Sequence, residues 1–173
     1  AGKFREDFIV DPIQGGAGTS LNMNANEVIA NRAIELLGGN KGDYSIINPN
    51  DDVNCSQSTN DVIPTAGKMT SLRLLKNLKH ELLQLHGALC KKAEEFNDVI
   101  KMGRTQLQDA VPIRLGQEFR AYSVAIMRDI HRMEKAMGEM RTLNLGGTAV
   151  GTGLNADEAY LHRIVPILSE VSD

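Results

Sequence analysis

Apolar residues recur at spacings of three and four along two long stretches of the chain. From Asn60 to about Phe96 the recurring residues are Leu75, Leu78, Leu82, Leu85 and Leu89. From Leu115 to about Leu145 they are Leu115, Phe119, Tyr122, Ile126, Ile130, Met133, Met137 and Met140. This spacing is typical of helices that bury one face against a partner. The pattern therefore predicts two helices of about thirty residues or more.

A shorter helix is predicted on each side of this pair. The first carries Met23, Val28, Ala30, Leu36 and Leu37, and a glycine pair at 38–39 ends it. The second follows a glycine-rich stretch at 146–155 and continues through Ile164, Ile167 and Leu168. The polar stretches 40–58 and 97–112 are predicted to be loops, because they are rich in turn-forming residues. The predicted fold class is all-α, with long antiparallel helices.

The length of the first long helix has a consequence for assembly. Helices this long need apolar partners, and other subunits of the same protein could supply them. A helix over 60–96 extends on the order of 50 Å. The polar stretches before and after it would then lie at opposite ends of the helical pair. A single site that used both would need a second subunit, so we expect a homo-oligomer.

Composition and charge exclude several classes of function. The chain has 42% hydrophobic residues and a net charge of -3, which argues against a nucleic-acid-binding face. No apolar run approaches the roughly 20 residues that span a bilayer, and no secretory signal opens the chain, so we expect no membrane partner and a cytoplasmic location. Cys55 and Cys90 are too few for a disulfide framework, and we expect both to be reduced structural residues outside any Cys/His cluster.

No metal site or nucleophilic arrangement is predicted. The four histidines, His80, His86, His131 and His162, have no metal-ligating partner four residues away. Asp51 and Asp52 could bind a cation, but adjacent acids in a turn more often cap it. The polar stretches offer neutral donors and no catalytic triad.

Two polar segments could bind an anion. Ser58, Thr59 and Asn60 precede a long helix, whose unpaired N–H groups and dipole favour negative charge. The alternative is a plain N-cap, since these are preferred capping residues. Thr19 and Ser20, before the first helix, have the same two interpretations.

The connector GRTQLQDAVP, residues 103–112, is the other polar segment. Arg104 and Asp109 could pair simply to organise the turn, whereas Thr105 and Gln106 are less easily explained as structural. Together the two segments suit a small dianionic acid, but they supply no obvious base.

Four blocks of sequence carry a resemblance to a known family. In order and spacing, these blocks closely resemble successive blocks of the aspartase/fumarase superfamily. They are GGAGTSLNMNANEVIANRA, NPNDDVNCSQSTNDVIPTA, KMGRTQLQDAVPIRLGQEFRA and NLGGTAVGTGLN. Ser20, Asn48, Thr59 and the run TQLQDAVP resemble the aspartase branch more than class II fumarases. The resemblance covers nearly the whole chain.

The resemblance implies a fold and a set of binding residues. Residues 1–59 would end an N-terminal helical region that carries substrate loops, and residues 60–173 would form part of a central helical bundle. Thr19, Ser20, Ser58, Thr59 and Asn60 match positions that bind one substrate carboxylate and hold the amino group nearby. Thr105 and Gln106 match a pair that contacts the other carboxylate region from a different subunit. Many relatives have histidine where this chain has Gln106, which can act as a neutral donor and acceptor.

The reaction implied by the resemblance is elimination of ammonia from L-aspartate to give fumarate. A base removes a proton from the carbon next to the side-chain carboxylate, and neutral donors stabilise the charge that develops. In the family the base is a serine of the pattern GSSxMPxKxN, which the 173 residues do not contain. The chain therefore resembles an internal fragment, with no catalytic residue of its own and no activity alone.

The resemblance also implies properties of the parent protein. It would be a homotetramer with active sites shared between subunits and no cofactor, apart from activation by a divalent cation at a site that the sequence does not identify. Two alternatives stay open at this point. One is a class II fumarate hydratase, and the other is a non-catalytic helical scaffold whose polar loops only cap helices.

Overall fold

The chain folds into helices and one small hairpin, arranged in two compact units. The computed structural model describes residues 2–172. The first unit combines the residues up to Met69 with those from Leu143 onward, and the second is Thr70–Thr142. The predicted all-α class is confirmed, with one two-stranded sheet added to it. The predicted division at residues 59 and 60 concerns the domains of a complete family member, and it stays a prediction.

The first unit contains the shorter helices. Its elements are η1 (Arg5–Asp7), α1 (Thr19–Leu36), the π-helical turn η2 (Pro49–Val53), the start of α2 (Thr59–Glu95) and α4 (Glu158–Ser172). α1 begins after Gly18, whose φ of 87° suits glycine, and it ends where the Gly39 N–H donates to the Ile34 carbonyl at 3.0 Å. Ala30 and Ile34 are fully buried, so this helix has the expected apolar face.

Three asparagines are also buried on α1, which the apolar pattern did not predict. Asn22, Asn24 and Asn26 are 3%, 7% and 6% exposed. Asn24 holds the N-terminal segment, because its Oδ1 accepts from Ile9 N–H at 2.9 Å and its Nδ2 donates to the Asp7 carbonyl at 2.9 Å. Buried amides of this kind are retained when all their polar atoms have partners. α1 is therefore held by polar contacts as well as by its apolar face.

α2 is one continuous helix of 37 residues, which corresponds to about 55 Å of helical rise. The predicted helix and its length are confirmed. Pro64 lies inside the helix rather than in its first turn, so the carbonyl of Asn60 receives no helical hydrogen bond. The Asn144 side chain takes that place, since its Nδ2 donates to this carbonyl at 2.6 Å. The proline thus opens a position at which the 143–149 segment attaches to α2.

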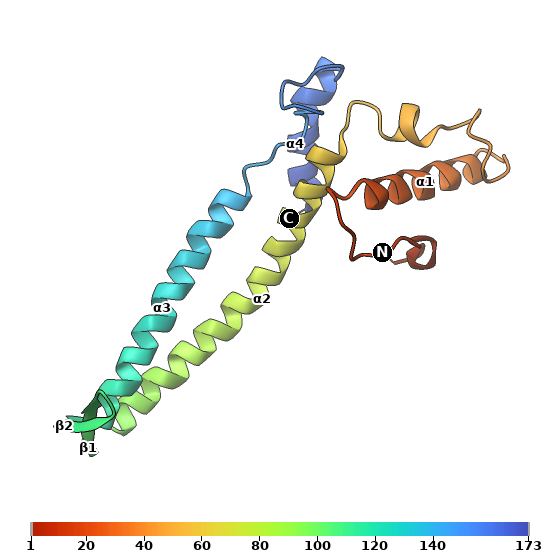
Figure 1. Ribbon diagram of the computed structural model, residues 1–173. Coiled ribbons are helices and arrows are strands. Elements are labelled where there is room, and N and C mark those ends of the chain that lie inside the picture. Colours follow the sequence, from red (N-terminus) through yellow and green to blue (C-terminus); the bar gives the residue numbers. More distant parts are fainter. Residues whose placement is uncertain (1, 173) are drawn as a thin grey trace. The chain divides into compact units, whose positions relative to one another are not determined.

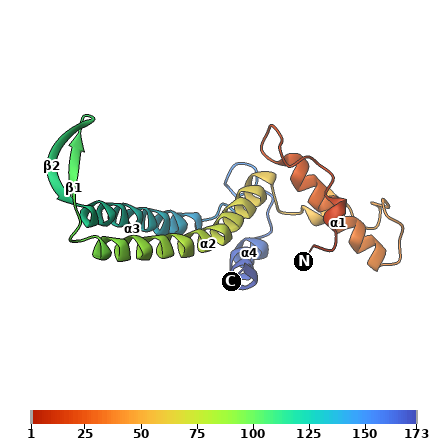
Figure 2. The same ribbon diagram turned by 90° about the horizontal axis from the view of Figure 1, so that it is seen from below.

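The second unit is an antiparallel helical pair joined by the hairpin. Figures 1 and 2 show the later part of α2 beside α3 (Leu115–Met140), with β1 (Ile100–Thr105) and β2 (Gln108–Arg114) at the junction. Gly116 sets the distance between the helices there, because a Cβ at this position would collide with the Ala93 carbonyl. The Phe96 and Phe119 rings, 5.4 Å apart between centroids, pack beside this contact.

The end of α3 differs from the prediction. The helix stops at Met140 instead of continuing to about Leu145. The residues beyond it leave the helical path because Asn144, Gly146 and Thr148 bond to groups at the start of α2. Contacts far away in the sequence therefore override the local helical pattern.

The segment predicted to be a loop between the long helices is an antiparallel β-hairpin. Thr105 pairs with Gln108, which leaves Gln106 and Leu107 as a two-residue turn with φ values of 50° and 61°. Both values are typical of a type I′ turn, where Asn and Gly are the usual residues. The register shifts between Met102 and Arg104, where Ala110 and Val111 of β2 lie opposite Gly103 alone, so β2 carries a bulge. Figure 2 shows the hairpin projecting from the helical pair.

The predicted leucine seam of α2 is covered only in part. Leu75, Leu82 and Leu89 are half-buried, while Leu78 and Leu85 are 48% and 45% exposed. Ala93 and Ile130 are the fully buried apolar residues described in this unit. Much apolar surface is therefore left on the helical pair. Among the described residues, no helix is both long and apolar enough to cross a membrane.

Candidate functional site

The start of α2 is closed by a reciprocal capping arrangement. The Ser58 Oγ accepts from Asn60 N–H at 3.2 Å, and the Asp61 carboxylate accepts from Ser58 N–H at 2.8 Å. This is the pattern of a capping box, with aspartate in the position that glutamate or glutamine usually takes. The N-cap interpretation of Ser58 is therefore confirmed, and its hydroxyl has a structural partner.

The Asp61 carboxylate is the most deeply buried charge of this region, at 1% exposed. Its other oxygen, Oδ2, accepts from the N–H groups of Gly146 at 3.2 Å and Thr148 at 3.1 Å. A buried carboxylate is tolerated when hydrogen bonds replace its hydration, and here backbone donors do so. Asp61 therefore fastens the glycine-rich segment to the first turn of α2.

The Thr59 hydroxyl is positioned by the buried asparagines of α1. Asn22 Nδ2 donates to Thr59 Oγ1 at 3.1 Å and to Asn54 Oδ1 at 3.2 Å. Asn26 Nδ2 donates to the same Asn54 oxygen at 3.1 Å. The sequence analysis missed this network, although three asparagines at alternate positions of an apolar helix were a visible signal. We call Asn22, Asn26, Asn54 and Thr59 the asparagine network.

The starts of α1 and α2 lie against each other. A Cβ added at Gly18 would lie 2.8 Å from Cγ2 of Ile63, so these two residues touch. Thr19 and Ser20 follow Gly18 directly and are exposed. Asn60 is also exposed, and its Nδ2 donates to the Ala149 carbonyl at 3.1 Å. The first unit thus brings together five predicted binding residues, namely Thr19, Ser20, Ser58, Thr59 and Asn60.

The other two predicted residues belong to the second unit. Thr105 ends β1, Gln106 lies in the hairpin turn, and both are exposed. The ion pair proposed to organise this turn is present, with Arg104 Nε 3.0 Å from Asp109 Oδ1. These two residues are opposite each other in the register, so their contact is a cross-strand pair. The association of Thr105 and Gln106 with the other five residues stays a prediction.

Two hydroxyl groups beside Asp61 lack hydrogen-bond partners. Thr148 Oγ1 and Tyr160 Oη are both buried, and neither has a partner among residues 2–172. Burial and, to a smaller extent, the negative charge of Asp61 raise the pKa of Tyr160 above its ordinary value. The surroundings of Asp61 therefore favour the neutral form of this phenol.

In the acidic pair before α2, Asp52 caps a turn, as expected. Asp52 Oδ2 accepts from Asn48 N–H at 2.7 Å, and Asn48 Oδ1 accepts from the N–H groups of Asn50 and Asp51. Within the described part of the chain, no group of three or more histidine, cysteine or acidic side chains could hold a metal ion.

The predictions that no histidine has a metal-ligating residue four positions away, and that no cysteine lies beside a histidine, are wrong. Cys90 lies four residues after His86, and its Sγ is 3.6 Å from His86 Nε2. Glu158 lies four residues before His162, with 3.7 Å between Oε1 and Nε2. Residues at this spacing share one face of a helix, so both pairs could have been predicted from the sequence. Cys90 therefore belongs to a Cys/His pair.

Comparison with protein families gives one match over the whole chain. A family model described as "Lyase" matches residues 1–173. The aspartate ammonia-lyase of Bacillus subtilis (strain 168) is 57% identical over 171 residues, which are 99% of this chain and 36% of that protein. The aspartate ammonia-lyase of Helicobacter pylori (strain ATCC 700392 / 26695) is 54% identical with the same coverage. The chain thus spans about a third of the length of these relatives.

Solved structures show the same fold. A fumarate lyase described as delta crystallin from Brucella melitensis, in a form bound to cobalt, matches with a TM-score of 0.88 and 55% identity, over 99% of this chain and 37% of that one. A class II fumarase from Schistosoma mansoni matches with a TM-score of 0.76 and 38% identity, over 90% of this chain and 33% of that one. The helical arrangement therefore occurs in several lyases.

Proposed function

Because this chain belongs to the lyase family whose model matches it from end to end, we propose that it is the substrate-loop segment of an aspartate ammonia-lyase. The complete protein would reversibly eliminate ammonia from L-aspartate to give fumarate. The observation that most supports this proposal is the group of neutral donors at the start of α2, beside the start of α1. Relatives at 57% and 54% identity are aspartate ammonia-lyases, which supports this substrate.

The geometry at the start of α2 suits a carboxylate. The positive end of a 37-residue helix favours an anion there. Asn22 donates to the Thr59 oxygen, so the Thr59 hydroxyl hydrogen is directed elsewhere and can be donated to a substrate. Such donors are preorganised, and they would stabilise the extra charge of an aci-carboxylate as it forms.

The hairpin turn would complete the site of another subunit. Gln106 and Leu107 hold positive φ values that cost non-glycine residues roughly 1 kcal/mol or more each, and such strain concentrates at functional sites. Leu107 is also fully exposed at the tip. Both features support a hairpin that is used in a contact. We propose that Thr105 and Gln106 bind the second carboxylate region of a substrate held by a neighbouring copy.

Self-association is part of the proposal. The exposed leucines of α2 and the apolar residues of α3 leave surface that further helices would cover. We propose a homotetramer with shared active sites, located in the cytoplasm. The proposal assigns the reaction no organic cofactor, and activation by a divalent cation stays an expectation.

The main test compares two matched substitutions on α2 in the complete protein. Thr59→Val removes the proposed donor, and we expect kcat/KM for aspartate to fall by roughly 10- to 100-fold, the effect of one hydrogen bond to a charged group. Thr65→Val is the control, because the buried Thr65 hydroxyl donates to the Asp61 carbonyl within the helix at 2.6 Å. It should lower stability and leave kcat/KM unchanged.

Several outcomes would contradict the proposal. An unaltered kcat/KM in a folded Thr59→Val variant would favour the scaffold, in which this residue only caps a helix. A complete protein that hydrates fumarate to malate in preference to adding ammonia would favour a fumarase. Turnover by the 173-residue segment alone would contradict our expectation that the base lies outside it.

Shared sites can be tested by mixing two defective variants. Thr59→Val and Gln106→Ala damage the two proposed halves of the site, and each should be weakly active alone. Co-expressed in one oligomer, they would leave some sites with both halves intact, so activity should exceed that of either variant. Activity equal to the mean of the two separate variants would show that both halves come from one chain.

A further inference from the structure

A thiol and an imidazole face each other in the second unit, and neither residue is among those proposed to bind substrate. Cys90 Sγ is 3.6 Å from His86 Nε2, within the range of a sulfur hydrogen bond. His86 Nδ1 is 3.0 Å from the backbone carbonyl of Ser123 on α3. A carbonyl only accepts, so Nδ1 carries the hydrogen and Nε2 is left as the acceptor that faces the thiol.

This arrangement has the three parts of an activated nucleophile. Cys90 is the nucleophile, His86 is the base, and the Ser123 carbonyl fixes the orientation and tautomer of the base. Ser123 is itself held rigidly, since it is 1% exposed and its hydroxyl donates to the Arg120 carbonyl at 2.8 Å. Cys90 and His86 are half-buried, so a small reagent can reach the pair in this unit.

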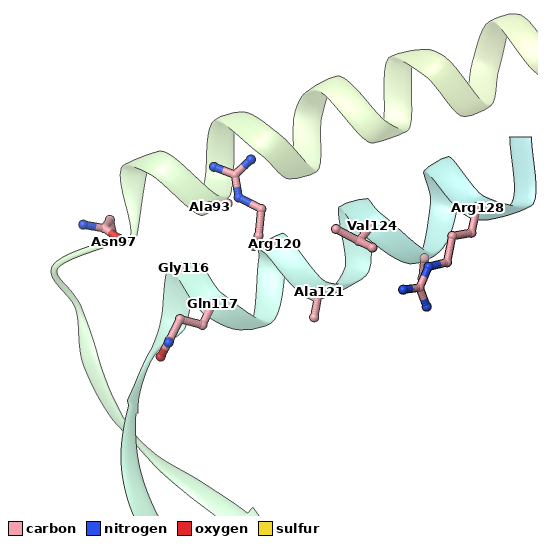
Figure 3. Close-up of a pocket in the computed structure, with 9 residues that line it drawn as sticks. Ala93, Asn97, Gly116, Gln117, Arg120, Ala121, Val124 and Arg128 are labelled. Atoms are coloured by element: carbon pink, nitrogen blue, oxygen red, sulfur yellow. The ribbon is translucent and has the colours of Figure 1, made fainter. Parts of the chain in front are cut away.

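An open groove lies about one helical turn from the pair. Ala93 follows Cys90 by three residues on α2, so the two lie on one side of the helix. Ala93 and Asn97 line a groove of about 570 Å³ together with residues of α3. Figure 3 shows the Arg120 guanidinium directed from α3 towards Ala93. The groove therefore offers a cation about one helical turn from the thiol.

The guanidinium of Arg120 has little competition for an anion. The carboxylate nearest to it is Glu94, at 4.0 Å, and both side chains are mostly exposed. A second arginine of the groove, Arg128, lies two turns further along α3. Small residues such as Gly116, Ala121 and Ala125 line the rest and leave room for a ligand. The groove thus suits a small carboxylate.

We propose that Cys90 is a modification site for small unsaturated dicarboxylates, which His86 activates and Arg120 attracts. The compound class follows from the three groups, because a thiolate adds to an electron-poor double bond and a guanidinium pairs with a carboxylate. If the proposed function holds, the fumarate released by the complete protein is such a compound. That source rests on the proposed function, whereas the reactivity of the site does not.

The addition balances without any further reactant. His86 Nε2 takes the proton from Cys90 Sγ, and the thiolate forms a bond to one carbon of the double bond. The π electron pair moves to the other carbon, which takes the proton back from the imidazolium. The product is a succinyl thioether, with one fumaric acid added to the side chain and nothing oxidised or reduced.

The first test compares the two cysteines of the chain within the complete protein. Native protein is incubated with added fumarate and, in parallel, with neutral iodoacetamide, and the modification of each cysteine is followed by peptide mass spectrometry. Cys55 is exposed and has no imidazole partner among the described contacts, so it is the internal control. We expect Cys90 to react at least about tenfold faster than Cys55, which is less than the roughly 100-fold or more that a well-positioned base contributes.

Two variants separate the roles of the partners. His86→Gln should slow the reaction of Cys90 with both reagents by about tenfold or more. Arg120→Gln should slow only the reaction with fumarate, because iodoacetamide carries no charge. The reactivity of Cys55 in each variant serves as the control for overall folding, together with the circular dichroism spectrum.

The inference would be overturned if Cys90 reacted no faster than Cys55 in native wild-type protein, a comparison that requires no variant. It would also be overturned if His86→Gln left the rate unchanged in a folded protein. A complete protein with no lyase activity whose Cys90 still adds fumarate would contradict the proposed function alone. An active lyase with an inert Cys90 would contradict this inference alone.

Discussion

The two ends of α2 are held by different kinds of contact. At the N-terminal end, polar side chains are buried, with Asp61 1% and Thr65 4% exposed, and hydrogen bonds join α2 to two other segments. At the C-terminal end, the contact is a close backbone approach at Gly116, with two aromatic rings packed at a tilt beside it. Hydrogen bonds fix direction as well as distance, which suits the part that we propose presents donors to a substrate. Close packing fixes distance only, which is sufficient to hold two helices together.

The largest expected effect comes from disrupting the hydrogen bonds at the N-terminal end of α2. Asp61→Asn keeps the size of the side chain but turns an amide NH₂ towards backbone N–H groups that need an acceptor. We expect a loss of roughly 3 kcal/mol in the free energy of unfolding of the complete protein, measured by urea titration. Asp51→Asn is the matched control, because Asp51 is exposed. Equal stability of the two variants would show that Asp61 does not fasten the 146–148 segment.

Disrupting the close packing at the C-terminal end of α2 should have a somewhat smaller effect on stability. Gly116→Ala puts a methyl group against the Ala93 carbonyl, and we expect a loss of roughly 2 kcal/mol as the helices move apart. Gly138→Ala, also on α3, meets no atom within 4 Å and should gain up to about 1 kcal/mol from its better helix propensity. Thermal unfolding of both variants checks this, and a stable Gly116→Ala variant would mean that the close approach is not needed.

A third substitution separates effects on stability from effects on activity at the N-terminal end of α2. Asn22→Ala removes the donor that positions Thr59, so we expect a loss of about 1 kcal/mol and a fall of about tenfold in kcat/KM. Asn24→Ala removes an equally buried amide of the same helix, one that holds the N-terminal segment instead. It should lower stability and not kcat/KM. Equal losses of kcat/KM in both variants would contradict a role of the asparagine network in positioning Thr59.

The smallest expected effect concerns Tyr160 and appears only at alkaline pH. Burial and the Asp61 charge raise the pKa of Tyr160 in the folded protein above its ordinary value of 10.0, so folding favours the neutral phenol. The resulting stability is fully present below pH 10.0 and is lost as the pH rises through the folded pKa. Tyr160→Phe should therefore lose less stability than wild type in this alkaline range.

The control for this prediction is Tyr122→Phe, since Tyr122 is 55% exposed. Unfolding of wild type and both variants would be followed by urea titration at neutral and alkaline pH. If Tyr160→Phe and wild type lost stability in parallel as the pH rises, the phenol would not contribute to the alkaline response.

Sequence periodicity was sufficient for the helices, since a stripe of apolar residues every three or four positions has no other common cause. It failed at the hairpin, where a bulge in β2 opposite Gly103 interrupts strand alternation and turn-forming residues dominate the composition. It also failed at the end of α3, where Asn144 bonds to a residue that lies 84 positions earlier in the chain. Such a distant partner leaves no local signal.

The residues of the candidate site could be proposed from the sequence, but the side chains that hold them in position could not. Ser58, Thr59 and Asn60 were visible because capping residues before a long helix are a local pattern. Asn22 was not, because a polar residue on a helix is normally expected to face water. The His86 and Cys90 pair was visible in its spacing of four residues, although no Cys/His arrangement was predicted.

Pro64 gives a warning for anyone who would improve this protein by design. Replacing a proline inside a helix with alanine ordinarily increases stability, since it restores a missing backbone hydrogen bond of the helix. At this position the restored N–H would compete with Asn144 for the same carbonyl oxygen. α2 would become more regular while its attachment to the 143–149 segment weakened, so a higher melting temperature here would accompany a more loosely held segment.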